Sequence, residues 1–214
     1  MNFKKAIVEL RKKARKRNFD QSLDLIINLK KFDPKKEKLT ISFSLPNPFK
    51  KKKIGAFLES GISSAGLERV ITKSEIERID KKEMKKIAKK VDFFIATARM
   101  MPLVAKKFGK VLSSKGKMPD PAIGAILKEE DEKEIARVVK KLENLTRIKV
   151  KEPSIKVAIG KESMDDEKLV ENAETAFNAI VEAIPEGKAN VKNVLLKFTM
   201  SKPVVVENGK GKKG

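Results

Sequence analysis

The chain has 214 residues, of which 50 are Lys or Arg and 29 are Asp or Glu, so its formal net charge is +21. Such a charge repels itself unless a polyanion neutralises it, which makes nucleic acid the first partner to consider and an anionic membrane surface the second. The sequence contains no Cys and no His. Disulfides, thiol catalysis and thiolate metal sites are therefore excluded, and the commonest general base is absent.

The remaining composition narrows the class further. Trp and Tyr are also absent, so only Phe could stack on bases. No stretch approaches the roughly 18 apolar residues that a spanning helix needs, so we expect a soluble protein without membrane segments. The composition argues against an enzyme and indicates no cofactor, although Lys, Asp and Glu chemistry stays open. The length allows one large or two small domains.

The N-terminal part predicts one helix followed by two strands. Residues 3–16 carry apolar side chains at helical spacing, with Lys and Arg on the other faces. A transit peptide is also basic and amphipathic, but this stretch lacks the serines that such peptides favour. Residues 22–30 and 39–45 alternate apolar and polar side chains, which predicts an antiparallel pair of strands with one wet face.

The pattern changes after the two prolines at positions 46 and 48. Short apolar runs without alternation are typical of buried parallel strands, and they occur at 54–58, 69–72 and 92–97. Helical patterns lie between and after them, at 76–91, 101–112 and 135–145. We interpret residues 109–121 as a basic loop and 147–151 as a strand that ends before Pro153. Alternating strands and helices predict a small βαβ-type domain.

Alternation returns in the C-terminal part. Residues 155–159 predict a strand that stops at Gly160. Ser163 is a good N-cap for a helix that runs to Ile184, and the acidic residues 165–167 suit its positive end. A last strand at 194–200 runs into Ser-Lys-Pro, which ends the ladder because proline has no N–H to donate.

The strands with alternating side chains at both ends of the chain, and the βαβ pattern between them, together predict a discontinuous domain and a fold of mixed class. Residues 1–48 and 153–206 should form a two-layer α+β domain with an antiparallel sheet. It should be interrupted by a Rossmann-like α/β domain over residues 49–152. Residues 207–214 should form a disordered basic tail.

Three local motifs have ordinary explanations. Residues 109–117 resemble a P-loop, but six residues separate the glycines and Met118 occupies the place of the magnesium-binding hydroxyl. The stretch is either a basic loop near phosphates or a solvated one. Residues 144–146 match a glycosylation acceptor by chance. The acidic run 129–132 could bind a cation, but a solvated helix start explains it better.

The last strand offers the first candidate site. Its outer face carries Lys197 and Thr199, and the turn adds Ser201 and Lys202. Lysine and hydroxyl groups at a strand end can hold a phosphate-sugar backbone. The alternative is an edge strand with a solvated face.

Three segments in this order resemble the ribosomal protein L-one family in its archaeal form: residues 16–22, 116–121 and 197–200, reading KRNFDQS, GKMPDP and KFTM. The resemblance covers essentially the whole chain and includes IGK at 159–161 and PEGKANVK at 185–192. It implies a two-layer α+β domain built from both termini, with a Rossmann-like domain inserted on two hinge strands.

The resemblance also implies a site and partners. The partners would be large-subunit stalk rRNA, exit-site tRNA and the chain's own messenger, bound by a monomer within the cytoplasmic ribosome. Recognition would use RNA shape, backbone and 2′-OH groups. With the turn residues above, the predicted RNA-binding set is Lys16, Arg17, Phe19, Gln21, Ser22, Gly160, Lys161, Lys197, Thr199, Met200, Ser201 and Lys202.

Two positions depart from the family pattern. Ser201 stands where the family has glycine, and residues 113–117 replace a Gly-Pro-Arg-Gly-Lys loop. Two other classes stay open beside the stalk protein. A general nucleic-acid-binding or architectural protein would bind without preference, and an enzyme would bind a nucleotide in the α/β domain.

Overall fold

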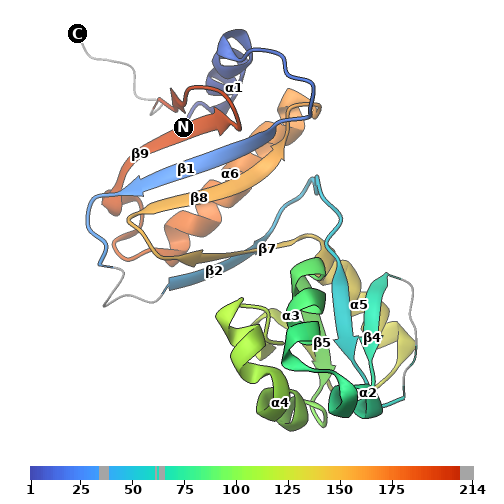
Figure 1. Cartoon of the computed structure of the whole chain (residues 1–214). Helices are drawn as coiled ribbons and strands as arrows, with labels where there is room; N and C mark the ends of the chain where they lie inside the picture. Colours follow the sequence, from blue (N-terminus) through green and yellow to red (C-terminus); the bar gives the residue numbers. More distant parts are fainter. Residues whose placement is uncertain (34–38, 61, 63–65, 208–214) are drawn as a thin grey trace, which may run out of the picture. The chain divides into compact units, whose positions relative to one another are not determined.

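The computed structural model describes residues 1–33, 39–60, 62 and 66–207 (Figure 1). The chain divides into two compact units. The first unit comprises Met1–Phe49 and Leu145–Gly214, and the second comprises Lys50–Asn144. Most of the predicted tail, residues 208–214, lies outside the described residues.

The first unit contains an antiparallel four-stranded sheet in the order β10-β9-β1-β8. Its strands are β1 (Ser22–Leu29), β8 (Ser154–Lys161), β9 (Val191–Phe198) and β10 (Val204–Val205). Every second residue of β1 is buried, at Leu23, Leu25, Ile27 and Leu29. This period of two gives the sheet one core face, as the alternation predicted.

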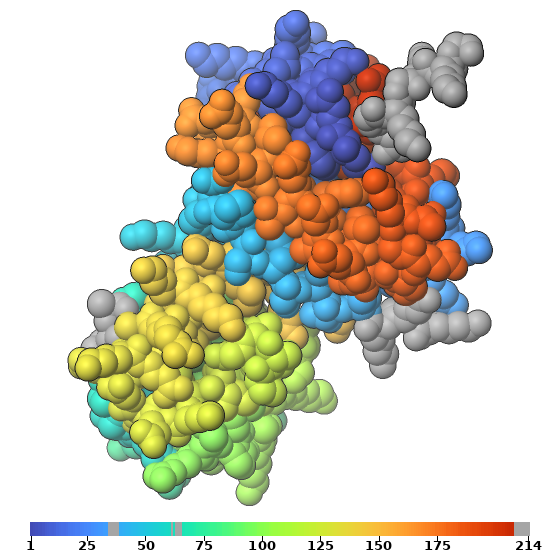
Figure 2. Space-filling model, turned by 180° about the vertical axis from the view of Figure 1, so that it is seen from behind, coloured from blue at the N-terminus to red at the C-terminus, as the bar shows by residue number. Residues whose placement is uncertain are grey.

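Two helices cover that face: α1 (Phe3–Lys13) and α6 (Asp166–Ala183). Figure 2 shows the atoms of α1, in blue, bordering those of α6, in orange. Phe3 of α1 and Phe177 of α6 have ring centroids 5.9 Å apart. One apolar cluster joins the helices to the sheet, so both ends of the chain share a single core. A short 3₁₀ turn, η2 (Gly187–Asn190), connects α6 to β9.

A second, two-stranded sheet consists of β2 (Leu39–Ser44) and β7 (Leu145–Val150). The predicted pairing of the strands at 22–30 and 39–45 is wrong, since β2 pairs with β7 in register Leu39↔Val150 to Ser44↔Leu145. The physical reason is that both edges of β1 are already occupied by β8 and β9. Pairing with β2 also groups β7 with the first unit.

The second unit is a parallel sheet in the order β4-β3-β5-β6. Its elements are β3 (Ile54–Phe57), β4 (Leu67–Ile71), α2 (Lys73–Arg78), α3 (Lys81–Lys90), β5 (Phe93–Thr97), α4 (Met101–Ser114), η1 (Pro121–Ile123), β6 (Ile126–Leu127) and α5 (Glu132–Glu143). All four residues of β3 are buried, as expected for a central parallel strand. The predicted combination of α+β and α/β architecture is confirmed.

Several predicted boundaries are wrong. The first helix ends at Lys13, and α4 continues through Gly109 to Ser114, where a loop was expected. The short strands β6 and β10 were not predicted at all. Ser163 does not cap α6, because the helix begins at Asp166 and its N-cap is Asp165. The Ser163 hydroxyl instead donates to Asp20 Oδ2 at 2.9 Å.

Candidate nucleic-acid interface

The strand register brings distant parts of the sequence to one end of the antiparallel sheet. Ser22 lies opposite Lys161 of β8, and Leu23 lies opposite Phe198 of β9. Because β1 runs antiparallel to both neighbours, the residues before β1 lie beside those that end β8 and follow β9. We call the exposed and half-buried residues of this edge the basic rim: Lys16, Arg17, Phe19, Ser22, Lys161, Thr199 and Met200.

Hydroxyl and ammonium groups meet at the centre of the basic rim. Ser22 N donates to Thr199 Oγ1 at 3.1 Å, and Thr199 N donates to Ser22 O at 3.1 Å. Lys161 Nζ donates to Ser22 Oγ and to the Asp20 carbonyl oxygen, each at 3.2 Å. These contacts fix the lysine beside the Ser22 hydroxyl and the Thr199 hydroxyl beside the Ser22 backbone, which is a suitable arrangement for a phosphate or a ribose.

Two residues of the basic rim expose large apolar side chains to solvent. Met200 is 60% exposed and Phe19 is 51% exposed. Exposed side chains of this size do not contribute to the core, so they are available to a partner. Phe19 is thus a surface residue that could pack on a sugar, and it is not a core residue. Lys16 and Arg17 lie exposed beside it and have no ion-pair partner among the described residues.

Gln21 lies beneath the basic rim, with 1% exposure. Its Nε2 donates to Glu162 Oε2 at 3.0 Å, and its Oε1 accepts from Met200 N at 3.0 Å. One side chain therefore ties together the segments that precede β1, follow β8 and follow β9. We assign Gln21 a positioning role below the surface.

Gly160 is also buried. A Cβ built on Gly160 would lie 2.2 Å from Cδ2 of Leu169 on α6. The glycine is therefore required for the close approach of α6 to β8, and its role is packing.

Lys197 is half-buried on the outer face of β9, directly opposite Asp24 of β1. Burial raises the pKa of the Asp24 carboxyl, and the charges of Lys197 and Lys161 partly offset that effect. Asp24 was not singled out in the sequence, because only the strand register reveals a carboxylate between two predicted RNA-binding lysines.

The turn after β9 explains how serine can occupy position 201, where the family has glycine. Ser201 N donates to Phe198 O at 3.0 Å, and Phe198 N donates to Ser201 Oγ at 3.0 Å. The turn begins at Thr199, so β9 ends two residues earlier than predicted. Among the described residues, Glu186 is the one non-glycine with positive φ, so Ser201 needs no glycine-like backbone. Lys202 is exposed next to it.

Arg11 supports the loop that follows β8. Its Nε donates to Asp166 Oδ1 at 2.6 Å, and its two terminal nitrogens donate to the carbonyl oxygens of Glu162 and Met164 at 2.8 and 2.7 Å. The sequence placed Arg11 among the solvated basic residues of the first helix. Its position one turn after the buried Ile7 puts it at the border of the apolar face, but the sequence does not show which groups it meets there.

The basic loop of the second unit has a structural use for its lysine. Gly116 has φ +65°, a conformation that favours glycine. Lys117 Nζ donates to the carbonyl oxygens of Ala88, at 2.9 Å, and of Val91, which lie at the C-terminus of α3. Lys117 therefore caps a helix, as a cation at the negative end of a helix dipole does.

The fold and the site define a class: a strongly basic protein of one α+β unit and one α/β unit, with hydroxyl, lysine and apolar groups gathered at one end of the antiparallel sheet. In the described part of the chain, no three His, Cys, Asp or Glu residues are placed to hold a metal ion. No helix there is long and apolar enough to cross a membrane.

Comparison with known proteins gives the family. The model of the ribosomal protein L1p/L10e family matches residues 10–202, so the chain belongs to that family. The chain is 38% identical to the large ribosomal subunit protein uL1 of Methanothermococcus thermolithotrophicus, with 96% of this chain and 98% of that protein aligned. It is 36% identical to uL1 of Nanoarchaeum equitans, with 93% and 97% aligned. The family and archaeal form predicted from the sequence are confirmed.

Proposed function

We propose that this chain is a structural component of the large ribosomal subunit and binds stalk rRNA through the basic rim. The contacts would be made by the seven residues of the basic rim together with the neighbouring Lys197 and Lys202. Bound to the stalk rRNA, the protein assists the release of deacylated tRNA. It also represses translation of its own messenger. Family membership and the relatives' assignment to the large subunit support the ribosomal location.

One observation carries the RNA-binding part: Lys161, Ser22 and Thr199 meet at one sheet end, beside the exposed Met200 and Phe19. Folded RNA presents phosphates and 2′-hydroxyls in its shallow minor groove, and it is recognised mostly by shape. Ammonium and hydroxyl groups suit those contacts, and the two apolar side chains can pack on sugar faces. Gln21 and Ser201 hold the surrounding turns from below.

The test uses deproteinised large-subunit rRNA from Methanothermococcus thermolithotrophicus, titrated with the full chain at fixed salt. Thr199→Ala and Met200→Ala should weaken binding strongly while the far-UV circular dichroism and thermal midpoint stay near wild type. Thr199→Ser keeps the hydroxyl and is the matched control. Val205→Ala removes a 57% exposed side chain from β10 and controls for loss of apolar surface in general. Wild-type affinity in both alanine variants would refute the site.

General nucleic-acid binding is the second candidate, and the net charge of +21 favours it. The two candidates differ in specificity. A stalk protein should prefer its structured rRNA over random duplex by at least about a thousandfold, as specific binders do. A general binder should bind both alike, with an affinity that falls steeply as salt rises because it depends on released counterions.

The tRNA and messenger roles need their own measurements. A messenger site should compete with rRNA for the basic rim, so Met200→Ala should weaken binding to both RNAs. The messenger probe is a transcript of the chain's own reading frame with its leader. Repression is measured as the yield of a reporter placed behind that leader, with wild type and Met200→Ala compared.

A further inference from the structure

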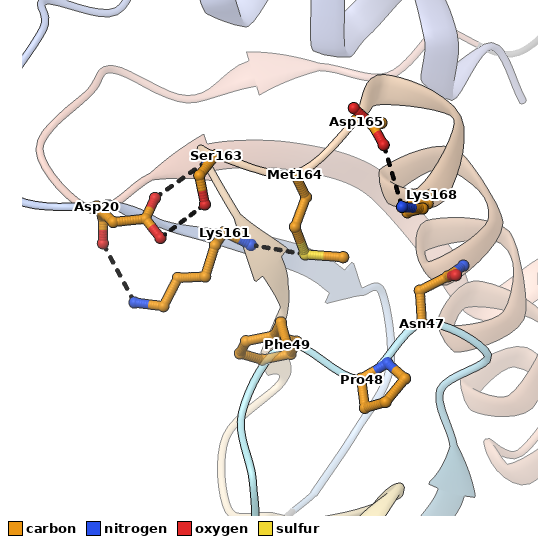
Figure 3. A pocket seen from close by; sticks show the side chains of 9 residues that line it. All are labelled: Asp20, Asn47, Pro48, Phe49, Lys161, Ser163, Met164, Asp165 and Lys168. Carbon is orange, nitrogen blue, oxygen red and sulfur yellow. Dashed lines mark hydrogen bonds and ion pairs between the residues drawn. The ribbon is translucent and has the colours of Figure 1, made fainter.

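A hollow of about 450 Å³ opens in the first unit next to the basic rim (Figure 3). Residues 47–49, which follow β2, form one side, and the other side is formed by Asp20, Lys161, Ser163, Met164, Asp165 and Lys168. Asp20 and Lys161 border both the hollow and the basic rim. The volume falls in the range of about 300–1,000 Å³ that is usual for small-ligand sites. We propose that the hollow receives one nucleotide extruded from the bound RNA, with its base stacked on Phe49.

The chemistry of the lining favours a nucleoside over a bare phosphate. Phe49 supplies a half-buried aromatic ring and Met164 a half-buried thioether, which together offer an apolar contact for a flat base. The carboxylates of Asp20 and Asp165 balance the charges of Lys161 and Lys168 in the same lining, so the hollow has no surplus of positive charge to hold a bare phosphate. The carboxylates can accept hydrogen bonds from ribose hydroxyls or from base amino groups.

Lysines stand where the flanking phosphates of an extruded nucleotide would pass. Lys161 lies at the side shared with the basic rim, and Lys168 pairs with Asp165 at 3.1 Å. The lining thus offers an apolar contact and acceptor groups for the base and the ribose, and lysines for the flanking phosphates. Proteins that read folded RNA commonly stack an unpaired base on an aromatic side chain in this way.

The walls of the hollow are already held in place. Asp20 accepts from Ser163 N at 3.0 Å and from Ser163 Oγ at 2.9 Å, which uses two of the roughly four acceptor positions of its carboxylate. On the other side, the buried Asn172 accepts from Asn47 N at 3.0 Å and donates to the Asn47 carbonyl oxygen at 2.8 Å. A preformed site loses little free energy to ordering when it binds.

The test compares Phe49→Leu with Phe32→Leu in the full chain. Both phenylalanines are half-buried and pack on the same core, but Phe32 follows the far end of β1. The probe is the same deproteinised rRNA at fixed salt. Phe49→Leu should weaken binding about tenfold, the size of one lost base–aromatic stack, and Phe32→Leu should not. Ultraviolet irradiation of the wild-type complex should cross-link a nucleotide to the peptide that contains Phe49.

This inference rests on the proposed RNA binding, and the two can fail separately. If wild type selects the rRNA and Phe49→Leu binds equally well, the nucleotide site is refuted and the proposed function stands. If both leucine variants lose the same affinity, core packing is responsible and the nucleotide site is again refuted. If wild type shows no preference for the rRNA, the proposed function fails and the nucleotide site fails with it.

Discussion

Replacing Gly160 by Ala should destabilise the first unit, because no room exists for a methyl group. The new Cβ would lie 2.2 Å from Leu169 Cδ2 and 3.3 Å from Met164 Sδ. Leu169 has no exposed surface and sits on α6, so it cannot move into solvent. Overpacking of this kind costs about 1–3 kcal/mol, and the short contact to Leu169 places this variant near the upper end.

Gly109 provides the matched control in the second unit. It lies inside α4, and a Cβ there would meet nothing within 4 Å. Gly109→Ala should therefore stabilise the chain by about 0.5–1 kcal/mol, the helix-propensity difference between the two residues. The same substitution, Gly to Ala, should thus lower the free energy of unfolding at position 160 and raise it at position 109.

Urea unfolding followed by far-UV circular dichroism measures both variants, since the chain has no Trp or Tyr to report by fluorescence. Leu169→Ala removes the atoms that clash, so adding it to Gly160→Ala should cost less than the sum of the two single changes. A wild-type midpoint for Gly160→Ala, or strictly additive costs in the double variant, would refute the packing argument.

Two further predictions concern polar groups. Gln21→Leu leaves Met200 N and Glu162 Oε2 without their partner, so it should cost about 2 kcal/mol and also weaken rRNA binding, measured by the same unfolding and titration. Asp24→Asn should raise the thermal midpoint at neutral pH. Burial raises the folded-state pKa of Asp24 above 3.8, so ionisation opposes folding as the pH rises through that range, and the gain of the variant should vanish below 3.8. An equal gain at all pH values would contradict this reasoning.

The strands with one buried face could be predicted because their side chains alternate. β1 and β9 follow that pattern with every second residue buried. Strand pairing could not be predicted, because alternation says which face is buried and nothing about the neighbour. The pairing of β2 with β7 joins positions about a hundred residues apart, and a nearby partner for β2 was the simpler expectation. β10 is two residues long, too short for any period to show.

The candidate site shows a similar limit. Carrying the family's positions over named segments that the fold brings to one end of the sheet, but it treated surface and buried residues alike. Gln21 and Gly160 stand beside exposed residues in the sequence and carry no local mark of burial. The three-dimensional structure shows that Gln21 is buried and bonded to Glu162 and Met200, and that Gly160 packs closely against Leu169.

The basic rim and the residues beneath it therefore form an outer and an inner layer with different physical roles. The outer layer, including Met200 and Phe19, contributes little to folding because it is exposed. The inner layer, Gln21 and Arg11, makes hydrogen bonds that join segments from both ends of the chain. Changes in the outer layer should reduce RNA binding at constant stability, whereas changes in the inner layer should reduce both together. The ratio of the two losses thus assigns each residue to its layer, without a structure of the complex.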